Sequence, residues 1–250
     1  MKKILLFLLL FAWHSSLLLA QVGEYRNDFS MGVTGGYVMS SVNFTPTVPQ
    51  ASHTGMTGGV AFRYVCEKYF KTVASVYGEI NYTQMGWKED IRTKDNAPVI
   101  NGVTGLAEEY SRTINYVQVP LMAHLAWGRE HKGFNFFVNL GPQFGFFMSE
   151  KTEMNFNFDD RNTADRATTI AAQDTMAIEK KFDYGIVAGG GIEYSIPRMG
   201  HFLLEGRYYY GLGNLYGDSK RDFFGSSNFS TIMIKLSYLF DITKTKNKKH

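Results

Sequence analysis

The sequence has little of several features that would place it in a common class of protein. It contains one cysteine, Cys66, in 250 residues, which excludes an internal disulfide. Beyond the first twenty residues, no apolar run is long enough for a transmembrane helix. The formal net charge of +3 falls to about +1 when Lys2 and Lys3 are set aside. The chain therefore lacks the basic excess that would predict binding to nucleic acid.

Motifs of enzyme chemistry are also absent from the sequence. There is no His-x-Glu cluster, no spaced cysteine set and no phosphate-binding glycine motif that opens a helix. No serine or aspartate is implied as a partner for His124, and we expect His53 in a connection and His201 at a turn. The pair Asp159-Asp160 is better explained as a solvated acidic pair than as a cation site. We predict that the protein is not an enzyme and has no catalytic residues, metal or cofactor.

The N-terminal residues predict export. Lys2 and Lys3 precede an apolar run over 4–13, and the small residue Ala20 stands at a plausible cleavage point. This pattern is typical of a secretory signal peptide, here residues 1–20. No cysteine follows Ala20, so a lipid anchor is not expected. An exported chain without helical spans can still be a protein of the outer membrane.

The main feature that the sequence does have is alternation at period two. From Phe182 to Ile196 the even positions are apolar or small, and the odd positions are mostly small or charged. A strand of this length is long for a soluble sheet. It suits a tilted strand that crosses a bilayer with alternate lipid-facing and lumen-facing residues. A soluble β-sandwich would also alternate, but with shorter strands.

Eight such segments predict the architecture. They lie near 28–39, 55–66, 71–88, 110–127, 133–149, 181–196, 200–212 and 229–241. Their connections are alternately long, near 40–54, 89–109, 150–180 and 213–228, and short, as in bacterial barrels with short periplasmic turns. Within 150–180, either a short helix over 164–172 or extension of the flanking strands is expected. Only a closed sheet can span a membrane. We predict an all-β fold, a transmembrane antiparallel up-and-down β-barrel of eight strands over residues 21–241, with both termini in the periplasm of a Gram-negative bacterium.

The alternation also predicts which side chains face the lumen. In the fifth strand Phe134 and Phe136 would face lipid, whereas Asn135, Asn139 and Ser149 would face inward. An eight-stranded barrel is just wide enough for its own side chains to fill it. The expected lumen network is Arg63, Glu79, Gln118, His124, Asp183, Glu193, Glu205, Arg207 and Lys235. Charges of both signs in a narrow lumen favour mutual pairing and a plug over a selective ion pathway.

Several strand motifs together point to a family. They are Tyr-Val-Gln-Val-Pro-Leu-Met at 116–122, Asn-Leu-Gly-Pro at 139–142, Phe-Asp-Tyr-Gly at 182–185 with Ala-Gly-Gly-Gly at 188–191, Arg-Tyr-Tyr-Tyr-Gly-Leu at 207–212 and Tyr-Leu-Phe at 238–240. In this order they resemble the PorT-like outer-membrane β-barrel proteins of Bacteroidota over the whole mature chain. The sequence departs from the pattern at Gln118, where glutamate is frequent, and in its tail beyond Phe240. The resemblance implies a porin-like integral barrel without shared catalytic residues, and the family name suggests a role accessory to protein secretion.

The functional expectation is a structural or interaction barrel with a filled lumen, and the alternative is a narrow porin-like channel for ions or small solutes. The expected partners are outer-membrane lipid and a protein bound at the long extracellular loops or at the periplasmic end. The basic tail at 242–250 would meet anionic lipid or an acidic partner, or remain a solvated end. Cys66 is interpreted as a small apolar residue rather than a reactive thiol.

Overall fold

The computed structural model describes residues 23–129, 132–168, 170–217 and 222–244. The predicted signal peptide and residues 245–250 of the basic tail lie outside these ranges. The strands are β1 (Glu24–Thr45), β2 (Gln50–Ala51), β3 (His53–Tyr69), β4 (Thr72–Glu89), β5 (Tyr110–Gly128), β6 (Gly133–Met154), β7 (Phe182–Ile196), β8 (Gly200–Gly211) and β9 (Ser226–Thr243). A single turn of 3-10 helix, η2, covers Ala172–Asp174. Among the described residues, no helix is long and apolar enough to span a membrane.

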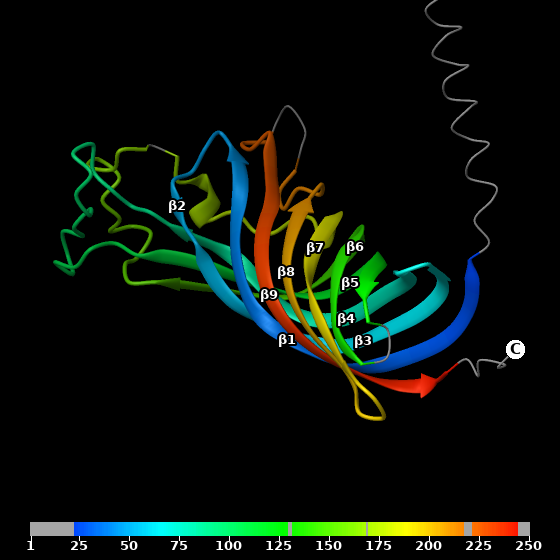
Figure 1. Cartoon of the computed structure of the whole chain (residues 1–250). Helices are drawn as coiled ribbons and strands as arrows, with labels where there is room; N and C mark the ends of the chain where they lie inside the picture. Colours follow the sequence, from blue (N-terminus) through cyan, green and yellow to red (C-terminus); the bar gives the residue numbers. More distant parts are fainter. Residues whose placement is uncertain (1–22, 130–131, 169, 218–221, 245–250) are drawn as a thin grey trace, which may run out of the picture.

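The strands form one closed antiparallel sheet. Their order is β2-β4-β3-β1-β9-β8-β7-β6-β5, and the additional pairing of β4 with β5 closes the ring (Figure 1). β2 contributes only two residues beside the end of β4, so the wall consists of eight long strands. Successive long strands are neighbours, which makes the barrel up-and-down. The predicted fold class is therefore confirmed.

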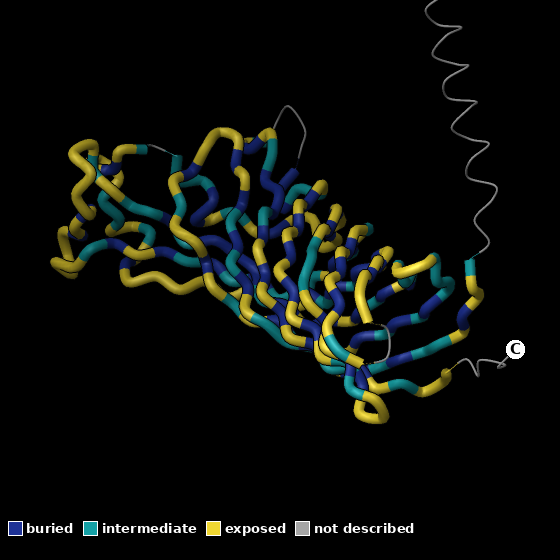
Figure 2. Tube along the Cα trace, viewed as in Figure 1, coloured by how far each residue is buried: buried dark blue, intermediate teal, exposed yellow. Residues whose placement is uncertain are grey.

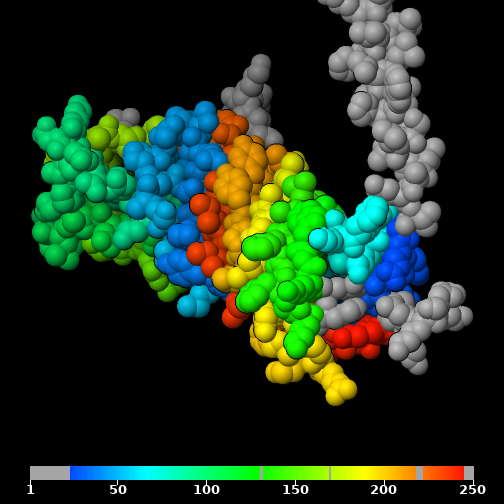
Figure 3. Space-filling model, in the orientation of Figure 1, coloured from blue at the N-terminus to red at the C-terminus, as the bar shows by residue number. Residues whose placement is uncertain are grey.

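The two ends of the barrel differ. β1 begins and β9 ends at one end, which we call the terminal end (Figure 1). The longer connections 90–109 and 155–181 gather at the opposite end, which we call the loop end. In the space-filling view the teal-green atoms of 90–109 form a solid mass there (Figure 3).

Alternate residues along the strands face opposite sides of the wall. In β8 the side chains of Phe202, Leu204 and Tyr208 are exposed, whereas Glu205 and Arg207 are buried. The same alternation of buried and exposed residues runs along the other strands (Figure 2). A continuous belt of exposed apolar side chains around a barrel is the surface expected to meet lipid.

Several strands are longer at the loop end than the sequence predicted. Much of the predicted connection 40–54 is strand, because β1 continues to Thr45 with Val42 and Phe44 still facing inward. His53, predicted to lie in that connection, opens β3, where it is buried and its Nε2 lies 2.8 Å from Thr113 Oγ1. β6 likewise extends to Met154. The expected extension of a flanking strand is therefore present, the described residues of 164–171 are not helical, and η2 begins only at Ala172.

The predicted facing of Ser149 was wrong. The side chain of Ser149 is exposed, and its hydroxyl accepts a hydrogen bond from the Asn115 side chain, which lies opposite it on β5. The pairing of β5 with β6 shifts register between Asn115 and Tyr116, so that Tyr116 pairs with Phe147 and Met148 is the extra residue. A β-bulge of this kind reverses the alternation beyond it. The rest of the predicted facing in β6 holds up to that bulge.

Candidate functional site

The structure places the nine predicted lumen residues inside the barrel, each with 5% or less of its surface exposed. They do not form a single cluster. Five of them form a central layer, two lie toward the terminal end and two toward the loop end. The central layer consists of Glu79, His124, Glu205, Arg207 and Lys235. Arg63 and Glu193 lie toward the terminal end, and Gln118 and Asp183 lie toward the loop end.

The central layer is a set of ion pairs that crosses the lumen. Arg207 on β8 donates two hydrogen bonds to the Glu79 carboxylate on β4, at 2.8 and 2.9 Å. It also donates to both oxygens of Glu205, at 3.0 and 2.7 Å. The Lys235 ammonium on β9 donates to Glu79 as well. Two cations thus face two carboxylates, which is the arrangement that makes burial of four charges tolerable.

The remaining contacts of this layer fix its orientation. Asn139 donates from Nδ2 to Glu205 at 2.9 Å, and its Oδ1 lies 2.8 Å from His124 Nδ1. Gly189 on the neighbouring strand leaves the space that Glu205 fills, because a Cβ at Gly189 would lie 2.4 Å from the Glu205 carboxylate oxygen. The glycine run at 189–191 is thus required, in part, by the lumen charges.

Toward the terminal end, a second layer of charges is built around Glu193. Arg63 donates from Nη1 to both Glu193 oxygens at 2.9 Å. His201 Nδ1 lies 2.6 Å from the same carboxylate, and His201 Nε2 lies 3.0 Å from Asp241. Ser30 donates to Asp241 at 2.7 Å. The layer ties β1, β3, β7, β8 and β9 together across the barrel.

Ser195, His201 and Asp241 meet in an order that resembles a hydrolase triad. Ser195 Oγ lies 2.8 Å from His201 Nδ1, on the ring nitrogen opposite Asp241. Glu193, however, is closer to the same nitrogen. Because each ring nitrogen of His201 faces a carboxylate, both nitrogens carry protons and no lone pair can accept the proton of Ser195. The arrangement clamps the wall together and is not a nucleophile with its base.

Toward the loop end the lumen is lined by buried aromatic rings. Tyr209 donates to Asp183 at 2.6 Å, and Gln118 lies 3.3 Å from the sulfur of Met85. Tyr116 packs edge-on against Phe229, with the ring centroids 5.9 Å apart. Asp183 and Gln118 are therefore polar groups among fully buried rings.

Beyond this layer lies a second core, which the sequence interpretation missed. We call it the crown: the described residues of 90–109, 155–181 and 212–225 with the strand ends beneath them. Phe44 packs against Trp87 at 5.4 Å and against Phe224 at 4.9 Å, and Tyr216 stacks near Phe224 at 5.6 Å. The signal available in the sequence was the aromatic residues Tyr216, Phe223 and Phe224 in an otherwise polar connection.

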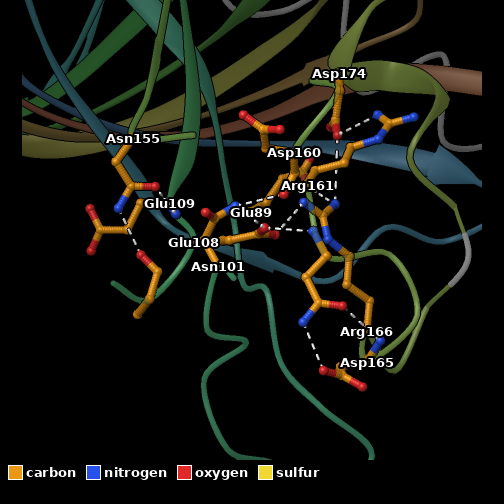
Figure 4. A network of polar contacts seen from close by, with 12 residues as sticks. Glu89, Asn101, Glu108, Glu109, Asn155, Asp160, Arg161, Asp165, Arg166 and Asp174 are labelled. Atoms are coloured by element: carbon orange, nitrogen blue, oxygen red, sulfur yellow. Dashed lines mark hydrogen bonds and ion pairs between the residues drawn. The ribbon is translucent and has the colours of Figure 1, made fainter. Parts of the chain in front are cut away.

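A buried polar network holds the crown loops together (Figure 4). The Arg166 side chain is 2% exposed and donates to Glu108 at 2.9 Å, and it lies 3.6 Å from Asp174. Asn101 donates to Glu108 at 3.0 Å and to the carbonyl of Asp160 at 2.8 Å. Burial of Glu108 opposes its ionisation, but the hydrogen bonds from Asn162, Asn101 and Arg166 outweigh it and hold the pKa of Glu108 below its usual range.

The chain matches the family described as outer membrane protein beta-barrel domain over residues 19–217. It therefore belongs to that family, and its place is the outer membrane of a Gram-negative bacterium. The coarser part of the predicted resemblance is thus confirmed. No curated protein matches the chain.

Several solved outer-membrane proteins are similar to it. Ail, the attachment invasion locus protein of Yersinia pestis, solved in complex with the heparin analogue sucrose octasulfate, is 13% identical with a TM-score of 0.35, and the match covers 85% of this chain and 99% of Ail. Neisserial surface protein A is 8% identical with a TM-score of 0.40, over 84% and 95% of the two chains. OprG from Pseudomonas aeruginosa is 14% identical with a TM-score of 0.39, over 87% and 98%. TM-scores below 0.5 say nothing about the ligands or partners of this chain.

Proposed function

We propose that this protein is a closed barrel whose function lies at its two ends, as a structural or interaction barrel, and that its lumen does not conduct. The observation that carries the proposal is the bidentate pairing of Arg207 with Glu79 across the lumen. A conducting pathway would have to pass this layer, and both charges are fully paired within it.

The layers on either side support the same conclusion. The Arg63–Glu193 pair lies toward the terminal end, and the rings of Tyr116 and Phe229 lie toward the loop end. A solute would meet these obstacles in series. Large aqueous channels are formed by barrels with about twice as many strands.

The finer parts of the proposal concern orientation and partners. The terminal end faces the periplasm and the crown faces the outside, in keeping with short turns at one end and long connections at the other. The strand motifs support placement among the PorT-like proteins of Bacteroidota, and with it a role accessory to protein secretion. In that role a protein partner would bind at the crown or at the terminal end.

The test is single-channel recording of the refolded protein in planar bilayers, after its heat-dependent migration on a gel has shown a folded barrel. Wild-type protein is expected to give a silent bilayer. The variant Arg207→Ala is compared with Arg92→Ala, which removes an exposed crown arginine outside the lumen. Discrete wild-type openings whose size changes with Arg207→Ala would replace the proposal with a narrow porin-like channel.

A further inference from the structure

A cavity of about 160 Å³ lies at the terminal end of the lumen, beneath the Glu193 layer. Each of the eight long strands contributes to its lining. The exposed side chain of Lys244 lies at its rim, so the cavity communicates with the solvent at this end. An engineered cavity of about 150 Å³ in another protein binds benzene, so there is space here for one six-membered ring.

The lining contains buried polar atoms that have no hydrogen-bond partner among the described residues. They are Arg63 Nε, Ser75 Oγ, His124 Nε2 and Asn135 Oδ1. All four side chains belong to residues that are more than nine-tenths buried. Buried polar atoms are nearly always satisfied in folded proteins. Because the cavity opens to solvent, water satisfies these atoms when the cavity is empty, and a ligand that binds here must replace that water with its own hydrogen-bonding groups.

The chemistry of one of these atoms follows from the network above it. Asn139 donates to Glu205 from Nδ2, so its Oδ1 is an acceptor, and His124 Nδ1 must donate the proton to it. In the neutral ring, His124 Nε2 then carries a lone pair and can accept a hydrogen bond. It lies 3.8 Å from Glu193, too far for a hydrogen bond.

The four atoms include both hydrogen-bond donors and hydrogen-bond acceptors. Arg63 Nε is a donor, His124 Nε2 and Asn135 Oδ1 are acceptors, and the Ser75 hydroxyl is either. The ligand must therefore donate and accept within one small volume. Hydroxyl groups do both, whereas a simple carboxylate only accepts and an ammonium only donates.

The charges around the cavity are balanced, which argues against a charged ligand. Arg26, Arg63 and Lys244 face Asp28, Glu193 and Asp241, three cations against three carboxylates. The protonated His201 adds one positive charge, and Glu24, which accepts from Arg26 at 3.1 Å, offsets it. Apolar side chains, Val65, Val73, Ala126 and Ile196, complete the lining and can receive C–H groups.

We infer that the terminal-end cavity binds a small neutral polyhydroxylated molecule, no larger than one sugar ring. Its hydroxyl groups donate to His124 Nε2 and Asn135 Oδ1 and accept from Arg63 Nε. Its carbon skeleton lies against the apolar part of the lining. The site is independent of whether the lumen conducts, because it lies at the mouth of the barrel.

The test is an NMR titration of the refolded full chain with ¹⁵N-labelled histidine, in phosphocholine micelles that contain no sugar headgroup. The probes are D-glucose and glycerol, with inorganic phosphate and methylammonium as charged comparisons. We expect a saturable shift of the His124 imidazole nitrogens with a polyol and none with the charged probes. Asn135→Ala is expected to weaken binding about tenfold, which is the effect of one hydrogen bond.

The matched pair Ala126→Leu and Ala188→Leu separates the cavity from the rest of the barrel. Ala126 lines the cavity, whereas Ala188 faces outward. Ala126→Leu should abolish saturation and Ala188→Leu should leave it unchanged. If Ala126→Leu prevents folding, Ser75→Ala replaces it as a smaller change in the lining, and it should weaken polyol binding. The absence of a saturable shift with either polyol, tighter binding of phosphate, or binding that Ala126→Leu and Ser75→Ala leave intact would overturn the inference.

Discussion

The lumen and the crown are both buried, but the contacts that cross the centre of each one differ. The lumen is held by ion pairs such as Arg207 with Glu79, whereas the crown is packed around rings such as Trp87 and Phe224. The difference follows from what each wall meets on its outer side. Where the outside is lipid, apolar residues face outward and polar residues face inward. Where the outside is water, apolar residues face inward and polar residues face outward.

Strand β1 shows the change from polar to apolar inward-facing residues along its length. Near the start of β1, Ser30 and Thr34 face inward while Val33 is exposed. Nearer the loop end, Val42 and Phe44 face inward while Asn43 is exposed. The facing alternates without interruption, but the chemistry of the two faces exchanges along the strand. The exchange marks the boundary between the membrane-spanning barrel and the crown.

The largest expected effect comes from breaking the lumen pairing. Glu79→Ala leaves Arg207 and Lys235 close together and buried without their shared carboxylate. Removal of one partner of a buried ion pair costs about 3–5 kcal/mol. The expected result is a matching fall in the free energy of unfolding of the whole barrel, measured in urea by loss of heat-dependent migration.

Asn81→Ala is the control for that variant. Asn81 donates one hydrogen bond to Glu79, at 2.7 Å, and its loss should cost about 1 kcal/mol. Equal destabilisation by the two variants would contradict the view that charge pairing holds the lumen.

The second effect should stay within the crown. Arg166→Ala leaves Glu108 and Asp174 buried without their shared arginine. We expect the free energy of local opening of the crown to fall by about 2 kcal/mol or more. Cleavage of the crown loops by chymotrypsin should then rise by roughly 30-fold, because 1.4 kcal/mol corresponds to tenfold. The urea midpoint of the barrel should not change.

Arg92→Ala serves as the control for the crown, because Arg92 pairs with Asp90 near the surface. It should leave loop cleavage unaltered. If Arg166→Ala instead lowers the stability of the whole barrel, the crown and the lumen are one cooperative unit and the comparison between them fails.

A change of pH should also distinguish the two regions. The pKa of Glu108 is lower in the folded crown than its ordinary value of 4.5, so its contribution to stability is present above that value and is lost as the pH falls through the folded pKa. Below about pH 4.5 the crown loops should therefore become sensitive to pepsin. Glu108→Gln should flatten this acid response, and an unaltered response would assign it to other groups.

The smallest expected effect is at the surface of β6. Lys151 pairs with Glu153 at 2.6 Å, and both side chains are well exposed. Exposed ion pairs contribute little to stability. Lys151→Ala should change neither loop cleavage nor the urea midpoint, and a clear change in either would show that the rim of the barrel matters more than its interior.

Much of the barrel could be predicted because its signal is local. Alternation at period two gives both the strands and the facing of Glu205, Arg207 and Lys235 without knowledge of the partners. The pairing of Arg207 with Glu79 could not be predicted, because it joins residues 128 positions apart and depends on closure of the sheet.

Other features escape the sequence for different physical reasons. The bulge at Met148 reverses the facing of Ser149 without any change in the pattern of residue types. The crown depends on contacts between separate connections, such as Arg166 with Glu108. The terminal-end cavity is defined by atoms such as Asn135 Oδ1 that lack a partner, and this is a property of the folded barrel only.

The most direct test of the account is a distance measurement in lipid bilayers by solid-state NMR. Dipolar recoupling between the Glu79 carboxylate carbon and the Arg207 guanidinium nitrogens reports whether the two groups touch across the lumen. The account predicts a strong through-space contact, because Arg207 donates to both Glu79 oxygens at 2.8 and 2.9 Å. The absence of that contact in a folded barrel would mean that the lumen charges are not paired there, and would contradict the account.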